Sequence, residues 1–357
     1  MVGNNGAIWN GLTAAKWANI NRFDVEYCSI SNATIGIDVS DNTYGNVSFT
    51  SLYVYAGQSE GIKIGKSTVG YLSGNVTIRD CQINQRGSHG IFVKAINGTV
   101  TIEHNSVYYC TGANKYGIFT ESCPNATVYN NLVQGCYEGI HAWDVDGGST
   151  YVGYNDVYDC TSSLSNGIWR GRGSTDTVGN EIHNCSNGIK TDDYGGTVEN
   201  NYIYVPSGGK GIYLYTGSTP YLTFNTISWQ QSGTNGGYGI YGGAASEGTC
   251  NPTLWGNSIQ HVNTGIYLGP GCNSQSKTRW SVIAYCGTAF YIDGCSPDLG
   301  TQSDYGNNNV HDITNWFIVS TSQQTLRAAE NWWGANRDPV SKMSGNIDYT
   351  PWLPSAP

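Results

Sequence analysis

Hydrophobic and polar positions repeat along the chain around one fixed anchor, a Gly-Ile pair. The distance between anchors varies, from 21 residues between Gly167 and Gly188 to 29 residues between Gly61 and Gly90. A fixed anchor with a variable period indicates stacked coils joined by loops of different length. The anchors are Gly36-Ile37, Gly61-Ile62, Gly90-Ile91, Gly117-Ile118, Gly139-Ile140, Gly167-Ile168, Gly188-Ile189, Gly211-Ile212, Gly239-Ile240 and Gly265-Ile266, continued in degraded form by Ala289-Phe290 and Trp316-Phe317.

A second pattern, Asn-x-Ile/Val and often a following Cys, precedes most anchors. Coils stack about 4.8 Å apart, so equivalent side chains of successive coils form ladders. We expect the Asn to adopt left-handed backbone geometry at a turn and to bond the Asn of the next coil. The Ile, Val and Cys should fill a narrow core. The pattern occurs at Asn105 with Cys110, Asn131 with Cys136, Asn155 with Cys160 and Asn180 with Cys185, and its first half at Asn201, Asn225 and Asn257.

These repeats predict an all-β protein, a right-handed parallel β-helix (solenoid) of about 11–13 coils with capped ends. The composition agrees, since Gly numbers 48, charged residues are 12%, and the Ala, Leu, Glu and Lys runs of long helices are nearly absent. A β-propeller needs longer repeats, and leucine-rich repeats would show Leu ladders. We expect the β-helix to fill residues 1–330. Residues 1–22, with Trp9 and Trp17, should form the N-terminal cap or first coil, and residues 331–357 a closing segment.

The Gly-Ile coil with its Asn ladder resembles the pectate-lyase-like superfamily of right-handed β-helix proteins. The ending Asn331-Trp-Trp-Gly, Asp338-Pro and Tyr349-Thr-Pro-Trp-Leu is similar to the terminal segment of many secreted bacterial and archaeal members. The resemblance covers nearly the whole chain, and it implies a secreted or cell-surface protein that acts on polysaccharide. It leaves the reaction open, because the superfamily contains lyases, hydrolases, epimerases and non-catalytic adhesins.

Charge and hydropathy narrow the class of partner. The formal net charge is −9 and the sequence pI about 5.0, so nucleic acid is not an expected partner. No apolar run is long enough to span a membrane, and no signal peptide pattern is visible, so we expect a domain cut from a longer or processed protein. We expect a monomer. Most of the 11 Cys should lie in the core ladder; Cys250, Cys272 and Cys295 are spaced so that one pair can bridge, with the pairing open.

The residue after each anchor Ile should point outward, because side chains alternate along a strand. This column reads Asp38, Lys63, Phe92, Phe119, His141, Trp169, Lys190, Tyr213, Tyr241, Tyr267 and Tyr291, and a parallel one holds Lys94, Glu121, Trp143, Asp192, Tyr215 and Asp293. Flat rings at coil spacing suit stacking on successive sugar rings. The alternative is that long loops cover this face and bury the rings. The predicted substrate-binding residues are Glu121, His141, Trp143, Trp169, Arg170, Lys190, Tyr213, Tyr215 and Tyr241.

Charged residues of this face gather on three consecutive coils, which predicts a glycoside hydrolase site. One carboxyl would protonate the leaving oxygen while another activates water or attacks the sugar. Carboxylates two coils apart lie roughly 9.6 Å apart, near the upper end of the range for inverting enzymes. Thr191-Asp192-Asp193 also resembles the paired aspartates of polygalacturonases, although that family's His-Gly and Arg-Ile-Lys motifs are missing in their expected order. The predicted catalytic residues are Asp144, Asp146, Asp192 and Asp193, with Arg172 assisting.

Two other functions fit the same residues. In a polysaccharide lyase, Asp144, Asp146, Asp192 and Asp193 would hold Ca²⁺ against a uronic acid, and Arg172, Arg170 or Lys190 would take the proton. The Arg-x-Pro-x-x-Arg pattern typical of pectate lyases is absent, and the aromatic richness of the face favours hydrolysis. In a non-catalytic polysaccharide-binding or cell-surface module, the charges would form a solvated surface of weak Asp–Arg pairs. Calcium is the one cofactor expected, and only if the protein is a lyase.

Overall fold

The chain is an all-β parallel β-solenoid of about 12 turns. The computed structural model describes residues 10–13, 21–40, 45–65, 72–144, 147–160, 162–192, 195–229, 236–334 and 338–357. Among them, the short 3-10 helix η2 (Pro339–Lys342) is the one helical element. The chain divides into two compact units, a first unit Met1–Glu181 and a second unit Ile182–Pro357.

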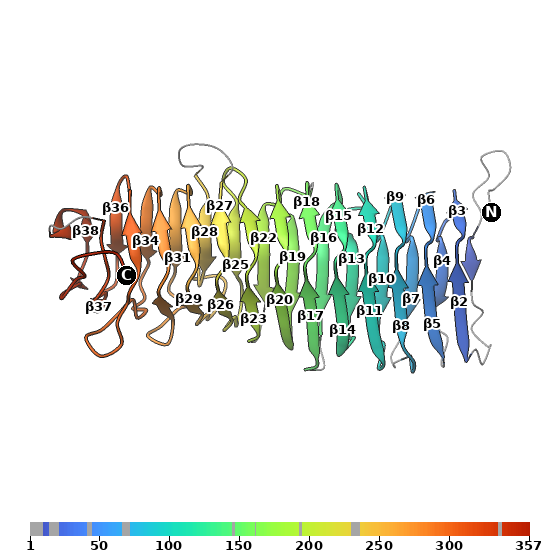
Figure 1. Cartoon of the computed structure of the whole chain (residues 1–357), viewed down its shortest axis with the longest axis horizontal. Helices are drawn as coiled ribbons and strands as arrows, with labels where there is room; N and C mark the ends of the chain where they lie inside the picture. Colours follow the sequence, from blue (N-terminus) through green and yellow to red (C-terminus); the bar gives the residue numbers. More distant parts are fainter. Residues whose placement is uncertain are drawn as a thin grey trace. The chain divides into compact units, whose positions relative to one another are not determined.

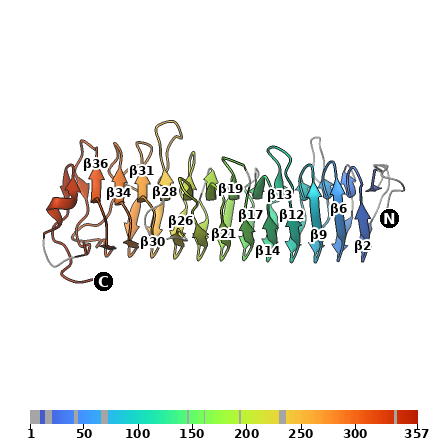
Figure 2. The ribbon, with the colours of Figure 1, turned by 90° about the horizontal axis from the view of Figure 1, so that it is seen from above.

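In the first unit, each coil gives one strand to each of three parallel sheets (Figures 1 and 2). The sheet with the Gly-Ile pairs, which we call the anchor sheet, runs β1 (Leu12–Thr13), β4 (Ile37–Ser40), β7 (Ile62–Gly65), β10 (Ile91–Lys94), β13 (Tyr116–Glu121), β16 (Glu138–Trp143) and β19 (Asn166–Gly171). The second sheet runs β2 (Arg22–Glu26), β5 (Asn46–Thr50), β8 (Val76–Arg79), β11 (Thr99–Glu103), β14 (Asn125–Tyr129), β17 (Ser149–Gly153) and β20 (Ser174–Val178). The third sheet runs β3 (Ser29–Ser31), β6 (Tyr53–Gly57), β9 (Gln82–Arg86), β12 (Ser106–Tyr108), β15 (Leu132–Gln134) and β18 (Asp156–Tyr158).

The second unit repeats this architecture, and β21 (Glu181–His183) lies at the division. Its anchor sheet runs β22 (Asn187–Asp192), β25 (Lys210–Leu214), β28 (Tyr238–Gly242), β31 (Thr264–Leu268), β34 (Thr288–Ile292), β36 (Trp316–Ser320) and β38 (Met343–Ser344). Its second sheet runs β23 (Thr197–Glu199), β26 (Tyr221–Thr223), β29 (Thr253–Trp255) and β32 (Lys277–Arg279). Its third sheet runs β24 (Tyr202–Tyr204), β27 (Thr226–Ser228), β30 (Ser258–Gln260), β33 (Val282–Ala284) and β35 (Asn309–His311), while β37 (Leu326–Arg327) pairs with β39 (Ile347–Asp348).

The predicted alignment of the anchors is confirmed within each unit. Ile91 pairs with Ile118 in the first unit, and Ile212 pairs with Ile240 in the second. The anchor Ile side chains are fully buried. The anchor Gly also faces inward: a Cβ on Gly117 would lie 2.4 Å from Val133 Cγ1 of the third sheet. Glycine is therefore required because a third-sheet side chain occupies the space that a Cβ would take.

The predicted asparagine ladder is confirmed, with one correction to its backbone. The Nδ2 atoms of Asn105, Asn131 and Asn155 each donate to the Oδ1 of the Asn one coil on, at 2.9–3.0 Å. However, the left-handed residue is the one before each Asn, for example His104 with φ 55° and Tyr154 with φ 54°. The left-handed turn lets the Asn side chain point inward, where its amide bonds backbone carbonyls as well as the next Asn.

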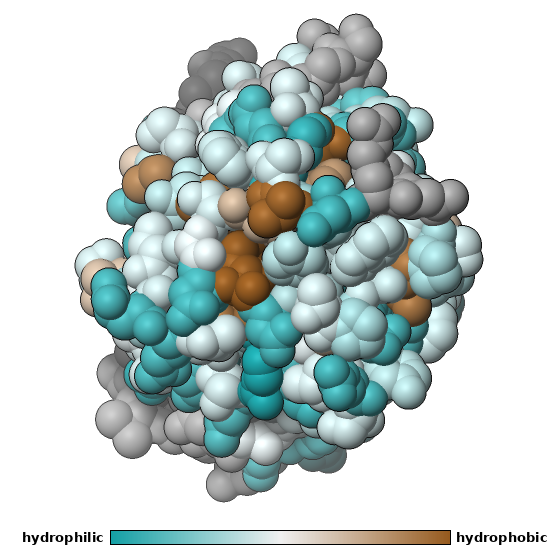
Figure 3. All heavy atoms as spheres, turned by 90° about the vertical axis from the view of Figure 1, so that its left-hand side faces the viewer, coloured by the Kyte–Doolittle hydropathy of each residue, from teal (hydrophilic) through white to brown (hydrophobic). Residues whose placement is uncertain are grey.

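The two predicted ends are described to different extents. Trp9 and Trp17 of the N-terminal cap lie outside the described residues. At the other end, Asn331 continues the ladder, accepting from Asn308 Nδ2 at 2.8 Å, and Trp333 is buried. Strand β38 pairs with β36. Figure 3 looks onto this end of the second unit, where hydrophilic atoms surround a small hydrophobic area. An open coil edge would instead be a site of edge pairing.

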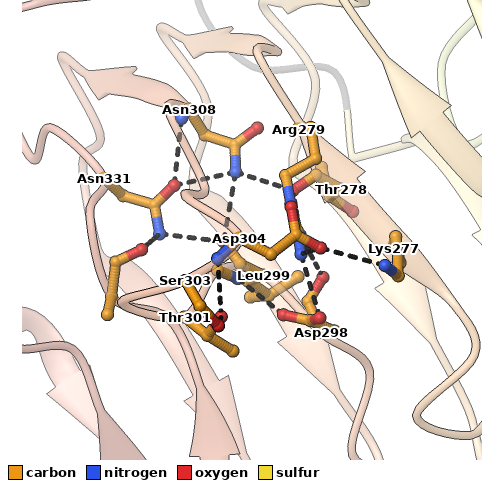
Figure 4. A network of polar contacts seen from close by, with 12 residues as sticks. Lys277, Thr278, Arg279, Asp298, Leu299, Thr301, Ser303, Asp304, Asn308 and Asn331 are labelled. Carbon is orange, nitrogen blue, oxygen red and sulfur yellow. Dashed lines mark hydrogen bonds and ion pairs between the residues drawn. The ribbon is translucent and has the colours of Figure 1, made fainter.

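A charged network ties the segment after β34 to the second sheet of the second unit (Figure 4). The buried Arg279 guanidinium contacts the Asp298 carboxylate at 2.9 Å and the Asp304 carboxylate at 2.9 Å. Lys277 Nζ also lies 2.9 Å from Asp304. Hydrogen bonds from Arg279 and then Lys277 hold the pKa of Asp304 well below its ordinary value. Asp304 therefore stays ionised in the folded protein at pH values where a free carboxyl is protonated.

Replacing Asp304 by Asn is expected to weaken the pH dependence of stability on the acid side. A carboxyl whose pKa is lower in the folded state stabilises above its ordinary pKa of 3.8, and this contribution is lost as pH falls through the folded pKa. Because the side chain is about half exposed, the effect should be small. Thermal unfolding followed from neutral pH to about pH 3 should show a shallower acid decline for D304N than for the wild type. The exposed Asp80 serves as control, since D80N should leave the decline unchanged; equal slopes for D304N and the wild type would contradict the role of this network.

Candidate functional site

The outer face of the anchor sheet carries the predicted columns of side chains. In the first unit, Phe92 pairs with Phe119, Phe119 with His141, and His141 with Trp169. In the second unit, Lys190 pairs with Tyr213, and Tyr241 with Tyr267. The order of these residues within each unit is therefore as the sequence predicted.

The rings of the first unit bury one another. Phe92 and Phe119 stack with centroids 5.0 Å apart, and Phe119 stacks on His141 at 4.7 Å. Tyr116 lies against His141 at 4.6 Å. Phe119 and His141 are only 9% and 6% exposed. Burial therefore applies to Tyr116, Phe119 and His141, which pack against one another, while Phe92 stays half-buried. His141 is too enclosed to stack on a sugar, whereas Trp143 and Trp169 stay half-buried.

Two predicted site residues of the first unit point inward, which corrects the sequence prediction. Arg170 pairs with Ala142 in the inward column and is 2% exposed; burial lowers its pKa to about 10, opposed by the Asp176 carboxylate. Asp144 is 1% exposed. Both follow an outward Trp by one residue, so alternation along the strand turns them inward. Neither group lies where a polysaccharide could reach it.

The other predicted residues of the first unit lie near the outer face. Glu121 Oε1 pairs with Lys94 Nζ at 2.8 Å, as expected for outward neighbours one coil apart. Arg172 is exposed, has φ 43°, and places its guanidinium 5.6 Å from the Trp143 ring centroid. Asp146 lies outside the described residues.

The rings of the second unit are more open. We define the tyrosine face as Tyr213, Tyr215, Tyr238, Tyr241, Tyr267 and Tyr291, all half-buried. Tyr241 and Tyr267 stack with centroids 4.7 Å apart and an interplanar angle of 11°. Tyr267 and Tyr291 follow at 5.7 Å and 24°. Three nearly parallel rings on three successive coils thus form a continuous stack, and its half-buried side presents the ring edges.

Lysines lie among these rings. Lys190 Nζ lies 4.3 Å from the Tyr215 ring centroid. Lys210 Nζ lies 3.6 Å from the Tyr213 centroid and 4.0 Å from that of Tyr241. Burial lowers the pKa of Lys210, Glu247 opposes this shift, and Lys190 adds to it. Cations held against aromatic faces fix the ring positions and offer donors to an acidic or hydroxyl group.

Two carboxylates border the tyrosine face and accept hydrogen bonds from it. Tyr213 Oη donates to Glu247 Oε1 at 2.5 Å, and Tyr267 Oη donates to Asp293 Oδ2 at 3.1 Å. Burial, and then the bonded carboxylate, raise the pKa of Tyr213 and of Tyr267 well above the ordinary value. The phenols therefore remain neutral donors at physiological pH, and the carboxylates keep their positions beside the rings.

The chain matches one family of known proteins. The model of the family described as "right handed beta helix region" matches residues 2–169 and 166–332. The chain belongs to this family. The fold is common to polysaccharide-active proteins, and the match is consistent with the pectate-lyase-like superfamily. Searches of curated proteins and of solved structures found no match.

The described residues contain neither a membrane-spanning helix nor a cluster of metal ligands. No helix formed by them has the length and hydropathy needed to cross a membrane. The same residues contain no group of three or more His, Cys, Asp or Glu arranged to hold a metal ion. Asp193, one of the four aspartates predicted to bind calcium in a lyase, lies outside them, as Asp146 does.

The remaining predicted carboxylate of the β-helix, Asp192, ends β22 and is 8% exposed. It belongs to the second unit, and Asp144 to the first. Joint action of these two aspartates remains a prediction.

Four residues on these faces were not predicted from the sequence: Tyr116, Lys210, Tyr238 and Glu247. The first three immediately precede an anchor Gly. Since both Gly and Ile face inward, alternation is interrupted and the residue before Gly faces outward. Strict alternation from the Ile would place it on the other side. Glu247 comes from the loop after β28, whose length varies between coils, so no periodic signal marks it.

Proposed function

We propose that this β-helix is an extracellular polysaccharide-active protein that binds a sugar chain along the tyrosine face of the second unit. The stack of Tyr241, Tyr267 and Tyr291 is the observation that carries the proposal. Since these rings stack on one another, their edges at coil spacing form a half-buried apolar strip along which successive sugar rings can lie. Lys210, Glu247 and Asp293 at the edges supply charged groups for sugar hydroxyls or carboxylates. The protein acts as a monomer, secreted or on the cell surface.

Hydrolysis of the bound chain is the second candidate function, and Glu247 and Asp293 favour it. Glycosidases use two carboxyl groups on either side of the scissile bond. Each of these two accepts a hydrogen bond from a tyrosine of the face, which orients it there. Asp192 is the remaining described candidate from the sequence. A calcium-dependent lyase using Asp144 is less well supported, because that carboxylate is buried.

A panel of neutral and acidic polysaccharides tests both functions. We expect at least one to bind, and hydrolysis would release new reducing ends without the absorbance of unsaturated uronates. Reducing ends that disappear in E247Q and D293N would support catalysis by this pair. Binding without reducing ends would remove hydrolysis and keep the binding function. Absorbance together with reducing ends would indicate a lyase, and a panel without any binding would contradict the proposed function.

A further inference from the structure

Two buried cysteines of the second unit have their sulfur atoms in direct contact. Cys250 Sγ and Cys272 Sγ lie 2.7 Å apart. Ordinary non-bonded contacts are about 3.5–4.0 Å, and a disulfide bond is about 2.05 Å. Cys250 and Cys272 are 1% and 4% exposed. The two thiols thus approach more closely than packing requires, at a place where solvent does not reach them.

The backbone geometry suits a bond between them. Cys250 N donates to Gly271 O at 3.0 Å, so Cys250 and Cys272 are opposite neighbours on successive coils. Parallel neighbours lie about 4.8 Å apart, within the Cα range of about 4.4–6.8 Å for disulfides. Gly243 leaves the space for both sulfurs: its φ is +70°, and a Cβ there would lie 2.6 Å from Cys272 Sγ.

Other cysteines of the β-helix are placed differently. In the core ladder of the first unit, Cys136 Sγ accepts from the amide of Cys110 at 3.5 Å. Cys295 is oriented by a hydrogen bond from its thiol to Leu268 O at 3.3 Å. The sequence left the pairing among Cys250, Cys272 and Cys295 open, and the sulfur contact selects the first two.

We propose that Cys250 and Cys272 form a disulfide bond when the protein folds in an oxidising compartment. A thiolate of one Cys attacks a low-molecular-weight disulfide such as oxidised glutathione, forming a mixed disulfide and releasing one thiol. The second thiolate then displaces the other glutathione thiol and closes the protein bond. Two protein thiols are oxidised, losing two electrons and two protons, and one small disulfide is reduced to two thiols.

The timing of this step follows from burial. The pKa of Cys272 is raised well above its ordinary value by its contact with Cys250 and by burial, so little thiolate forms in the folded coils. Exchange therefore takes place before the loops close. The bond then fixes the loop Gly243–Cys250 to the next coil, and with it Glu247, which accepts the hydrogen bond of Tyr213.

Peptide mapping tests the bond directly. The protein is refolded with mixed reduced and oxidised glutathione, then denatured with an alkylating reagent and no reductant. We expect nine of the 11 Cys to be alkylated and one peptide pair, holding Cys250 and Cys272, to be lighter by two hydrogen atoms until reductant is added. Alkylation of all 11, or a link that involves Cys295, would overturn the proposal.

A stability measurement separates the bond from a packing role. Wild type refolded under oxidising conditions should melt about 5 °C above the same protein refolded under reducing conditions. The C250S/C272S variant should show no such difference. The matched control is C286S, which removes another buried thiol and should keep the full difference. A difference that persists in C250S/C272S would overturn the proposal, whatever the outcome of polysaccharide binding.

Discussion

Replacing Asn131 by Ala is expected to lower the free energy of unfolding by about 4 kcal/mol. Asn131 is 2% exposed, and its Oδ1 accepts from both Asn105 N and Asn105 Nδ2 at 3.0 Å. Its Nδ2 donates to Ile102 O at 2.9 Å and to Asn155 Oδ1 at 3.0 Å. Alanine would remove these buried hydrogen bonds together and leave the Asn105 N–H without its acceptor; each bond contributes about 0.5–1.5 kcal/mol, and an unsatisfied buried group costs about 1–3 kcal/mol. Because the coils can relax partly around the alanine, the expected loss in free energy of unfolding is about 4 kcal/mol rather than the full sum of these costs.

Denaturant unfolding followed by circular dichroism measures this loss. Asn125, on the neighbouring strand β14, is exposed and serves as the matched control. Its replacement by Ala should change the free energy of unfolding by about 0.5 kcal/mol or less. Equal losses for N131A and N125A would show that the buried ladder contributes no more to stability than an exposed asparagine.

Replacing Tyr241 and Tyr267 together by Ala is expected to weaken polysaccharide binding about 100-fold. The two rings stack 4.7 Å apart at the centre of the tyrosine face. Loss of one aromatic contact of about 1.4 kcal/mol corresponds to a tenfold change in affinity. The test is a titration of wild type and Y241A/Y267A with the polysaccharide that binds in the panel.

The same unit offers a matched control for this double variant. Tyr202 and Tyr221 are 54% and 57% exposed but belong to the third and second sheets. Y202A/Y221A should leave the affinity unchanged, because these rings lie away from the tyrosine face. An equal loss in both double variants would indicate nonspecific ring contacts, and an unchanged affinity in Y241A/Y267A would place the sugar elsewhere.

Most of the fold follows from the sequence, because stacking makes equivalent residues neighbours. Each anchor Ile lies in the core for the same reason, and the Asn of one coil finds the Asn of the next, as at Asn131 and Asn155. The backbone of the ladder was not predicted correctly. The left-handed turn falls on the residue before the Asn, and His104 and Tyr154 adopt it although neither is a glycine, so residue type alone does not mark this position.

The candidate site was harder to predict, since small changes in direction decide exposure. Because Gly and Ile are two consecutive inward residues, Lys210 and Tyr238 lie on the outer face. Strict alternation from the Ile would instead predict an inward direction for both. The rings of the first unit form a column like that of the second, yet Phe119 and His141 are covered by neighbours. Periodicity gives the direction of a side chain and carries no information about what lies on top of it.

Loops are the least predictable part of this β-helix. Glu247 and Cys250 both belong to the loop after β28, and the loops that follow the described anchor-sheet strands differ in length and sequence from coil to coil. Their contacts with Tyr213 and Cys272 depend on the path of that loop across a neighbouring coil. The periodic pattern of the sequence does not predict such contacts.

A crystal structure of the protein with an oligosaccharide from the panel tests the proposed binding surface most directly. We expect sugar rings to lie over Tyr241 and Tyr267, with hydroxyl or carboxyl groups near Lys210, Glu247 or Asp293. An ordered oligosaccharide on the second or third sheet, with the tyrosine face bare, would contradict the proposal.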